Sequence, residues 1–167
     1  MKAILVIPLL LMIISANQQN SSQHFPQDYR SIMLDLKNII KKSQLSIEIY
    51  SSLFDHPRLS KSLQKAAQSG IMISVFIPKG TLTPTLKELA LYKNFSIFFT
   101  SGKLKNISST TIMFDKKQIM NFSLPLDESI LKNEKGKVLH NVKKRDLLRS
   151  NKLFNELGKQ STNYFLD

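Results

Sequence analysis

Hydrophobic positions in residues 43–80 predict a strand, a helix and a second strand, around which the rest of the chain is organised. Leu45, Ile47 and Ile49 sit among β-branched and aromatic neighbours, which favours a buried strand. The apolar run over residues 72–78 predicts the second strand. Two apolar strands joined by a helix form a βαβ unit, so we expect them to be parallel and covered on both faces.

The helix between these strands is predicted from its ends and from the spacing of its apolar side chains. Asp55 offers an N-cap oxygen, and Pro57 falls in the first turn, where its missing N–H costs little. Gly70 can take the left-handed conformation that ends a helix. The residues at helical spacing between these ends are Leu59, Leu63, Ala66 and Ala67.

Similar patterns predict the remaining elements. They are a helix over 26–42, a short helix capped by Thr83 and begun by Pro84, a strand over 95–99, two strands over 110–114 and 118–122, a short edge strand over 138–140 and a final helix over 144–157, with its inward side formed by Leu147, Leu148, Leu153, Phe154 and Leu157. The two strands over 110–122 should pair antiparallel. Residues 124–137 are expected to be irregular. The order predicts a single α/β domain, a mixed β-sheet flanked by helices.

The first residues have the layout of a secretory signal peptide. Met1 and Lys2 precede an unbroken apolar run over residues 3–14, which two small residues and a polar stretch follow. An uncleaved membrane anchor is the second interpretation, because the run is too short to cross a bilayer comfortably. A buried N-terminal helix is the third. The predicted domains are a signal peptide over 1–16, a mobile polar spacer over 17–25 and a folded domain over 26–167.

The charge of the chain favours anionic partners. The sequence has 24 Lys and Arg against 12 Asp and Glu, a formal net charge of +12. This balance suits nucleic acid, an acidic membrane surface or a phosphate-bearing substrate, although a lysine-rich codon usage would produce it too. The absence of cysteine excludes disulfides, thiol catalysis and cysteine-based metal sites. With three dispersed histidines and no clustered glycines, we expect no metal and no cofactor.

The βαβ unit, the later hairpin and the final helix together resemble a phospholipase D-like domain over roughly residues 29–157. In that superfamily the hairpin carries the motif His-x-Lys-x4-Asp, with a Gly-Ser pair further on. Here the Asp position holds Asp115 and the serine position holds Ser123. The His and Lys positions hold Ser108 and Thr110. The resemblance therefore implies a degenerate copy of the motif.

This degeneracy implies loss of the family's activity. In the family the histidine is the nucleophile and the lysine supplies charge to the phosphate oxygens. Ser108 has no neighbouring base in this pattern, and Thr110 carries no charge. We expect an exported, catalytically inactive protein that binds a phosphate-bearing ligand, phospholipid or nucleic acid, or a protein partner. Family sites unite two motifs, which implies a homodimer or pairing with another phospholipase D-like chain.

Two alternatives stay open. An active phosphodiesterase, of phospholipase or endonuclease type, would need a histidine close to Asp115, and His56 and His140 are the ordered candidates. A structural or interaction module would use the fold only as a scaffold. The simpler roles are a helix cap for His56 and a surface position for His140, while His24 falls in the spacer. Glu48 marks either a solvated face, which we favour, or part of the cleft.

Overall fold

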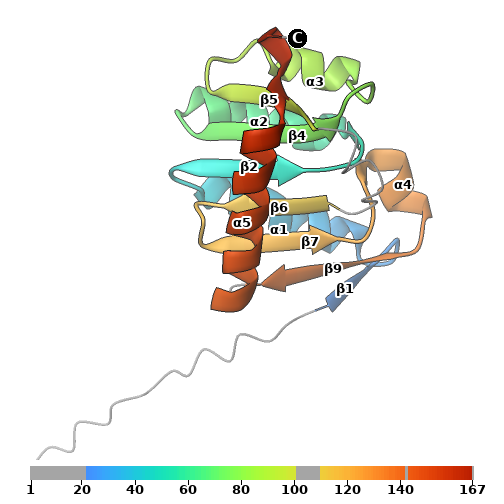
Figure 1. Cartoon of the computed structure of the whole chain (residues 1–167). Helices are drawn as coiled ribbons and strands as arrows, with labels where there is room; N and C mark the ends of the chain where they lie inside the picture. The colour runs from blue at the N-terminus through green and yellow to red at the C-terminus, as the bar shows by residue number, and fades with distance from the viewer. Residues whose placement is uncertain (1–21, 101–109, 142, 167) are drawn as a thin grey trace, which may run out of the picture.

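A computed structural model describes residues 22–100, 110–141 and 143–166 (Figure 1). The helices are α1 (Tyr29–Lys42), α2 (Pro57–Gln68), α3 (Pro84–Leu89), α4 (Glu128–Asn133) and α5 (Lys144–Gln160). The strands are β1 (Ser22–Phe25), β2 (Ser46–Tyr50), β3 (Phe54–Asp55), β4 (Met72–Pro78), β5 (Phe95–Thr100), β6 (Thr110–Phe114), β7 (Gln118–Phe122), β8 (Leu126–Asp127), β9 (Gly136–Asn141) and β10 (Thr162–Asn163), before a 3₁₀ turn at Tyr164–Leu166.

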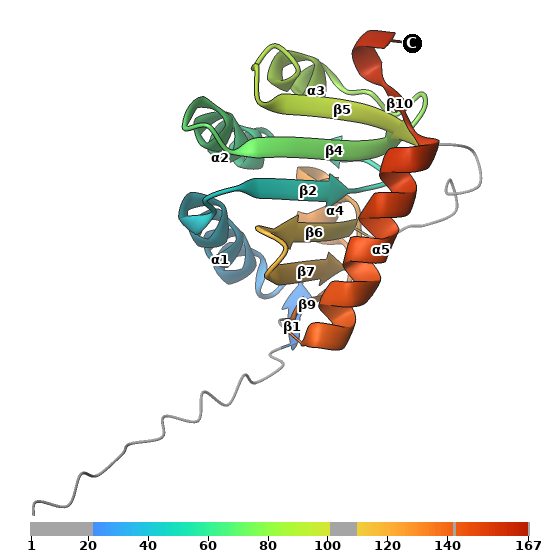
Figure 2. The ribbon, with the colours of Figure 1, turned by 60° about the vertical axis from the view of Figure 1, so that its left-hand side comes forward.

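The main sheet has the strand order β1-β9-β7-β6-β2-β4-β5-β10. β2, β4 and β5 are parallel, whereas every other pair in this sheet is antiparallel. Helices α1, α2 and α3 cover one face, and α5 crosses the other (Figure 2). β3 and β8 form a separate parallel pair. The predicted mixed sheet flanked by helices is confirmed, and so is the parallel βαβ unit β2-α2-β4.

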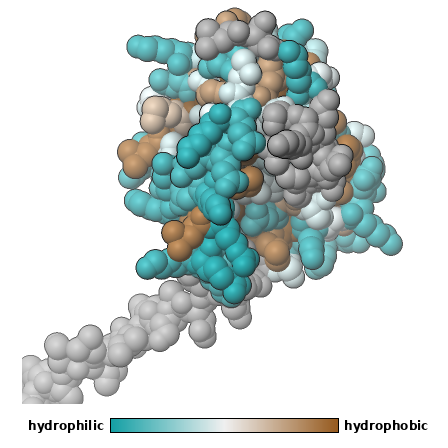
Figure 3. All heavy atoms as spheres, viewed as in Figure 1, coloured by the Kyte–Doolittle hydropathy of each residue, from teal (hydrophilic) through white to brown (hydrophobic). Residues whose placement is uncertain are grey.

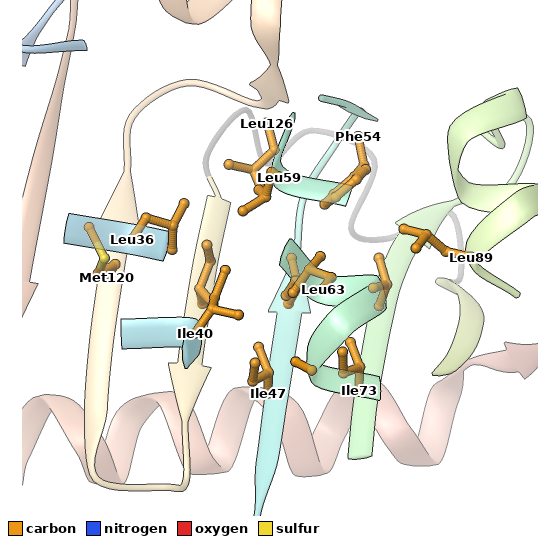
Figure 4. Packing of buried hydrophobic residues seen from close by; sticks show 14 of the residues in the cluster. Leu36, Ile40, Ile47, Phe54, Leu59, Leu63, Ile73, Leu89, Met120 and Leu126 are labelled. Atoms are coloured by element: carbon orange, nitrogen blue, oxygen red, sulfur yellow. The ribbon is translucent and has the colours of Figure 1, made fainter. Parts of the chain in front are cut away.

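Side chains from the two faces of the sheet form two hydrophobic clusters, as the period of two along a strand requires. Ile47 and Ile73 pack beneath α1 and α2, against Leu36, Ile40 and Leu63 (Figure 4). The smaller cluster lies under α5 and consists of Tyr50, Phe76, Met113, Phe154 and Leu157. The outer surface of α5 is hydrophilic (Figure 3).

The inward side predicted for α5 is only partly right. Phe154 and Leu157 are buried, but Leu148 is 60% exposed. Leu148 therefore points away from the sheet, because the buried stripe of a helix repeats at three and four residues and Leu148 falls outside it.

Local signals explain the ends of α2. Gly70 has a φ of +93°, as predicted for the residue that ends the helix. The N-cap is His56 and not Asp55: the backbone N–H of Leu59 donates to His56 Nδ1 over 3.2 Å. Asp55 lies one residue earlier, in β3, and accepts a hydrogen bond from Thr85. The capping role predicted for His56 is thus confirmed and that predicted for Asp55 was wrong, because an imidazole nitrogen can accept a hydrogen bond as a carboxylate oxygen does.

Both strands of the β6–β7 hairpin begin and end at the predicted residues. Its turn places Asp115 at φ 50° and Lys116 at φ 55°. Two consecutive left-handed residues, with the N–H of Lys117 donating to the Phe114 carbonyl at 2.9 Å, are typical of a type I′ turn. The register leaves residues 115–117 between the paired Phe114 and Gln118. Ile112 pairs with Met120 in the middle of the hairpin.

Three predictions about the edges of the domain were wrong. Residues 22–25, assigned to the spacer, form β1, where the ring of Phe25 stacks on Phe122 at 6.1 Å between centroids. β9 is longer than the predicted strand and lies between β1 and β7, not at an edge. The stretch expected to be irregular holds β8 and α4, which begins because Asp127 Oδ1 accepts from the N–H of Ile130 at 2.9 Å. Within the described residues, no helix is long and apolar enough to span a membrane.

Candidate functional site

Thr110, at the predicted lysine position of the motif, lies at the start of β6 and has no exposed surface. Its Oγ1 lies 2.7 Å from the Oγ of Ser51. Ser51 donates its one hydroxyl proton to the carbonyl of Leu53 at 2.7 Å and accepts from the N–H of Leu126 at 3.1 Å. Thr110 is therefore the donor to Ser51. The lysine position of the motif therefore holds a neutral side chain, and its hydrogen-bond network joins β6 to β8 and to the end of β2.

Asp115, at the predicted aspartate position, lies at the other end of β6. Its carboxylate accepts from the backbone N–H groups of Gln44, Leu45 and Ser46 at 2.9, 2.8 and 3.0 Å. Burial acts to raise the pKa of Asp115, but these three donors outweigh it and hold the pKa below its usual value. Asp115 ties the hairpin turn to the start of β2, which is a structural task.

Ser123, at the predicted serine position, connects β7 to β9. Its Oγ accepts from the N–H of Lys137 at 2.9 Å, and its own N–H donates to the Lys137 carbonyl at 3.0 Å. Because Thr110 pairs with Phe122, Ser123 and Thr110 lie toward the same end of the hairpin. Ser108 lies outside the described residues. The motif positions that the structure describes thus divide between the two ends of β6.

His56 is fully buried and caps α2, as predicted. Since Nδ1 accepts from Leu59, the ring proton sits on Nε2, which lies 3.2 Å from the hydroxyl of Tyr29. Tyr29 in turn donates to Glu128 Oε1 at 3.4 Å. Burial lowers the pKa of His56, and the nearby Glu128 only partly opposes this. His56 is therefore a neutral hydrogen-bonded cap.

Glu128, which accepts from Tyr29, also pairs with two cationic side chains. Lys132 Nζ lies 2.6 Å and Arg58 Nε 3.6 Å from its Oε1. The hydrogen bond from Lys132 is the main reason why the pKa of Glu128 is low. Burial raises the pKa of Tyr29, and Glu128 adds to this. The cluster joins α1, α2 and α4, and its His56 side chain, which has no exposed surface, lines a pocket of about 260 Å³.

Comparison with solved structures identifies the fold. NucT from Helicobacter pylori superposes with a TM-score of 0.80 at 16% identity, over 87% of this chain and 99% of that one. Nuc from Salmonella typhimurium, a phospholipase D family member, superposes with a TM-score of 0.69 at 14% identity, again over 87% of this chain and 99% of that one. The chain has a phospholipase D-like fold. No protein-family model matches the sequence, and no curated protein does.

The same fold lies within a longer protein of different description. TrmBL2, an archaeal chromatin protein whose structure shows a mode of DNA binding, matches with a TM-score of 0.63 at 14% identity, over 93% of this chain and 57% of that one. At these identities the likeness is one of fold. The phospholipase D-like scaffold predicted from the sequence is thus confirmed, whereas the chemistry of the site has to be argued from this chain's own residues.

His140 lies on β9, which runs between β1 and β7 inside the sheet, so the predicted surface position was wrong. It is half-buried in β9, and its Nε2 has no hydrogen-bond partner among the described residues. A pocket of about 250 Å³ is lined by His140 and Asp115 together with Lys42 and Lys117. The structure thus brings a histidine and Asp115 to one pocket. His24 is exposed on β1, at the edge of the sheet.

Glu48 is half-buried on the face covered by α5, so the favoured solvated position was wrong. Its Oε2 is buried with no partner among the described residues. Burial raises the pKa of Glu48, and the charge of Lys116 only partly opposes the effect. No group of three or more potential metal ligands is found within the part of the chain that the structure describes.

The partners of the candidate residues lie far from them in the sequence. Ser51, which holds Thr110, is 59 positions away from it in the chain. Tyr29 and Glu128, which surround His56, are 99 positions apart. No local pattern marks these residues, because only the packed sheet and helices bring them together.

Proposed function

We propose that this chain is a phospholipase D-like protein that binds a phosphate-bearing ligand without hydrolysing it. The observation that carries the proposal is the environment of Thr110. A cation at that position would stabilise the charge that develops on phosphate oxygens in the transition state. Thr110 is instead neutral, and its only hydroxyl proton is donated to Ser51. Ser108, at the nucleophile position, has no base beside it in the motif.

The ligand-binding part of the proposal is supported by charge and by fold. The formal net charge of +12 favours anionic partners. Matching structures include a phospholipase D family member and a DNA-binding chromatin protein. A phospholipid or a nucleic acid is therefore the class of ligand. We also propose export through a signal peptide over residues 1–16, and pairing with a second phospholipase D-like chain, as the sequence predicts.

The experiment measures binding and cleavage in one sample. Residues 17–167 are incubated with phosphatidylglycerol-containing vesicles or with a labelled single-stranded oligonucleotide, and the retained ligand is recovered. We expect retention of one of them, recovered intact. Retention of neither would overturn the binding role. Cleaved ligand would overturn the lack of hydrolysis.

A restored motif gives a matched comparison. Ser108→His alone tests whether a histidine suffices, and Ser108→His with Thr110→Lys completes the motif. We expect no turnover from either. A lysine at the fully buried position of Thr110 should also lower the free energy of unfolding by several kcal/mol, because an ammonium group would replace a satisfied hydroxyl. Turnover restored by the double variant, with the fold intact, would show that the cleft itself is competent.

One observation favours a second candidate function, an active phosphodiesterase with a relocated nucleophile. His140 shares its pocket with Lys42, Lys117 and Asp115, and its Nε2 has no partner among the described residues. Metal-independent turnover that is lost in both His140→Ala and His140→Gln would support this function. The carboxylate of Asp115 argues against it, because three backbone donors already hold that group.

A further inference from the structure

A basic groove runs along α1 and α2 on the face of the molecule opposite α5. It consists of two adjoining pockets of about 550 and 260 Å³ that share Leu34 and Lys37. The rings of Tyr29 and His56 stack at 6.3 Å where both helices begin, and Ser43 and Ser69 line the groove where both end. The two helices are therefore side by side and parallel. The groove follows most of their length, roughly 18 Å.

Cationic side chains line this groove along one stripe of each helix. The residues are Arg30, Lys37 and Lys41 from α1, and Arg58 and Lys65 from α2. No aspartate or glutamate lines either described pocket. Among the described residues, only Arg58 of these five forms an ion pair, with Glu128. The other four cations, Arg30, Lys37, Lys41 and Lys65, thus have no ion-pair partner among the described residues.

Helix stability does not account for the cations at the start of the groove. Arg30 and Arg58 lie in the first turns of their helices, and neither first turn contains an acidic residue. A cation there opposes the helix dipole. Lys41 and Lys65 lie in the last turns, where a cation is favourable. Arg30 is therefore a cation that neither its helix nor an ion pair accounts for. Lys37, in the middle of α1, also has no ion-pair partner among the described residues, whereas Arg58 is paired with Glu128.

The floor of the groove is apolar. Ile40, Ala66 and Ile71 form it, each less than a tenth exposed, while Leu34 at the rim is 60% exposed. Tyr29 and His56 are the aromatic side chains that line the groove; His56 has no exposed surface, and the Tyr29 hydroxyl is engaged by His56 and Glu128. Single-stranded nucleic acid is bound by stacking of bases on aromatic faces, for which this floor offers little. An anionic molecule with an aliphatic part fits better.

We propose that the groove between α1 and α2 binds an anionic phospholipid. The phosphate lies among Arg30, Lys37 and Arg58, and the first part of an acyl chain follows the apolar floor past Leu34. The methylene stems of Lys41 and Lys65 extend the apolar walls and leave their ammonium groups at the rim. The inference rests on the proposed phosphate-binding function and adds to it the site and the class of ligand.

The charge test uses sedimentation with vesicles of phosphatidylcholine alone or with a quarter phosphatidylglycerol. The test variant is Arg30→Glu with Lys37→Glu. Arg30→Glu places an acidic residue in a first turn, which favours α1, so unfolding does not explain a loss. The control is Lys144→Glu with Lys159→Glu, two exposed lysines of α5 with the same change of net charge. Each lost cation should weaken binding to the anionic vesicles about fivefold, so the affinity of the test variant should fall roughly 30-fold. The affinity of the control should fall much less.

The apolar test compares two leucines that are each 60% exposed. Leu34→Gln lies on the groove, and Leu148→Gln lies on α5. We expect Leu34→Gln to weaken vesicle binding, with no effect of Leu148→Gln. Competition with inorganic phosphate separates the headgroup from the whole lipid: if free phosphate at millimolar concentration does not displace the vesicles, the acyl chain contributes as proposed.

Each remaining outcome overturns a defined claim. Equal losses in the groove and α5 variants, or no effect of Leu34→Gln, would overturn the groove as the lipid site. Retention of the oligonucleotide without binding of anionic vesicles would overturn the lipid inference but keep the proposed function. Failure to retain either ligand would overturn both.

Discussion

At the scale of single residues, His56 is a histidine whose chemistry serves the fold. Its Nδ1 caps α2 and its Nε2–H faces Tyr29, an arrangement that needs the neutral ring. Burial lowers the pKa of His56 in the folded state below the ordinary value of 6.5. The unfolded chain therefore takes up a proton more readily, and stability is lost as the pH falls below about 6.5.

His56→Asn keeps a side chain that can cap a helix but does not titrate. We expect it to cost about 1–2 kcal/mol at pH 7.5, mainly through the lost contact with Tyr29. The difference from wild type should shrink between pH 6.5 and pH 5, as thermal unfolding at several pH values would reveal. His24→Asn, at an exposed position, is the control. A difference that stays constant over this range would contradict the neutral cap.

For Glu48 we expect the opposite dependence of stability on pH. Burial raises the pKa of its carboxyl, so the folded state disfavours the charge, and stability falls as the pH rises from about 4.5 through the raised pKa. Glu48→Gln should raise the melting temperature by roughly 2 °C at pH 7.5 and leave it unchanged near pH 4. Glu88→Gln, at an exposed position of α3, is the control. A loss of stability at pH 7.5 would mean that the carboxylate has a charged role.

At the scale of elements, the β6–β7 hairpin is held to β2 by Asp115. Its three backbone hydrogen bonds should be reduced in Asp115→Asn, whose amide keeps one acceptor oxygen and tolerates the left-handed turn. We expect a loss of about 2 kcal/mol in the free energy of unfolding by urea. Because the folded pKa is low, the stabilisation holds above about pH 3.8 and fades as the pH falls through the lower folded value.

A matched control and a binding readout sharpen this test. Glu134→Gln, an exposed residue after α4, should change the stability by less than about 0.5 kcal/mol. Asp115→Asn should bind anionic vesicles as wild type does. Loss of binding with unchanged stability would instead assign Asp115 a role in a site.

Elements with a strong local signal could be predicted from the sequence. Thr83 and Pro84 mark the start of α3, and Gly70 marks the end of α2, because caps and breakers act within a few residues. β1 and α4 could not be predicted in this way. β1 is a strand because it pairs with β9, which is far away in the chain, and α4 is a helix of six residues with little room for a repeating pattern.

At the scale of the whole molecule, the sheet and its two layers were predictable although the identity to the matching structures is only 14–16%. The order of apolar elements survives such divergence, because a core requires only hydrophobic side chains of suitable size. For the candidate site, the sequence predicted which positions belong to the motif but not what surrounds each of them. The burial of Thr110 depends on Ser51 and Leu126, and the basic groove depends on the packing of α1 beside α2.

The most direct test of the central claim is release of p-nitrophenol from bis-p-nitrophenyl phosphate, with residues 17–167 in molar excess over the substrate and chelator present. Excess protein detects even a single slow turnover. We expect no release above the rate without protein. Release that is lost in Ser108→Ala or His140→Ala would contradict it and would identify an active phosphodiesterase.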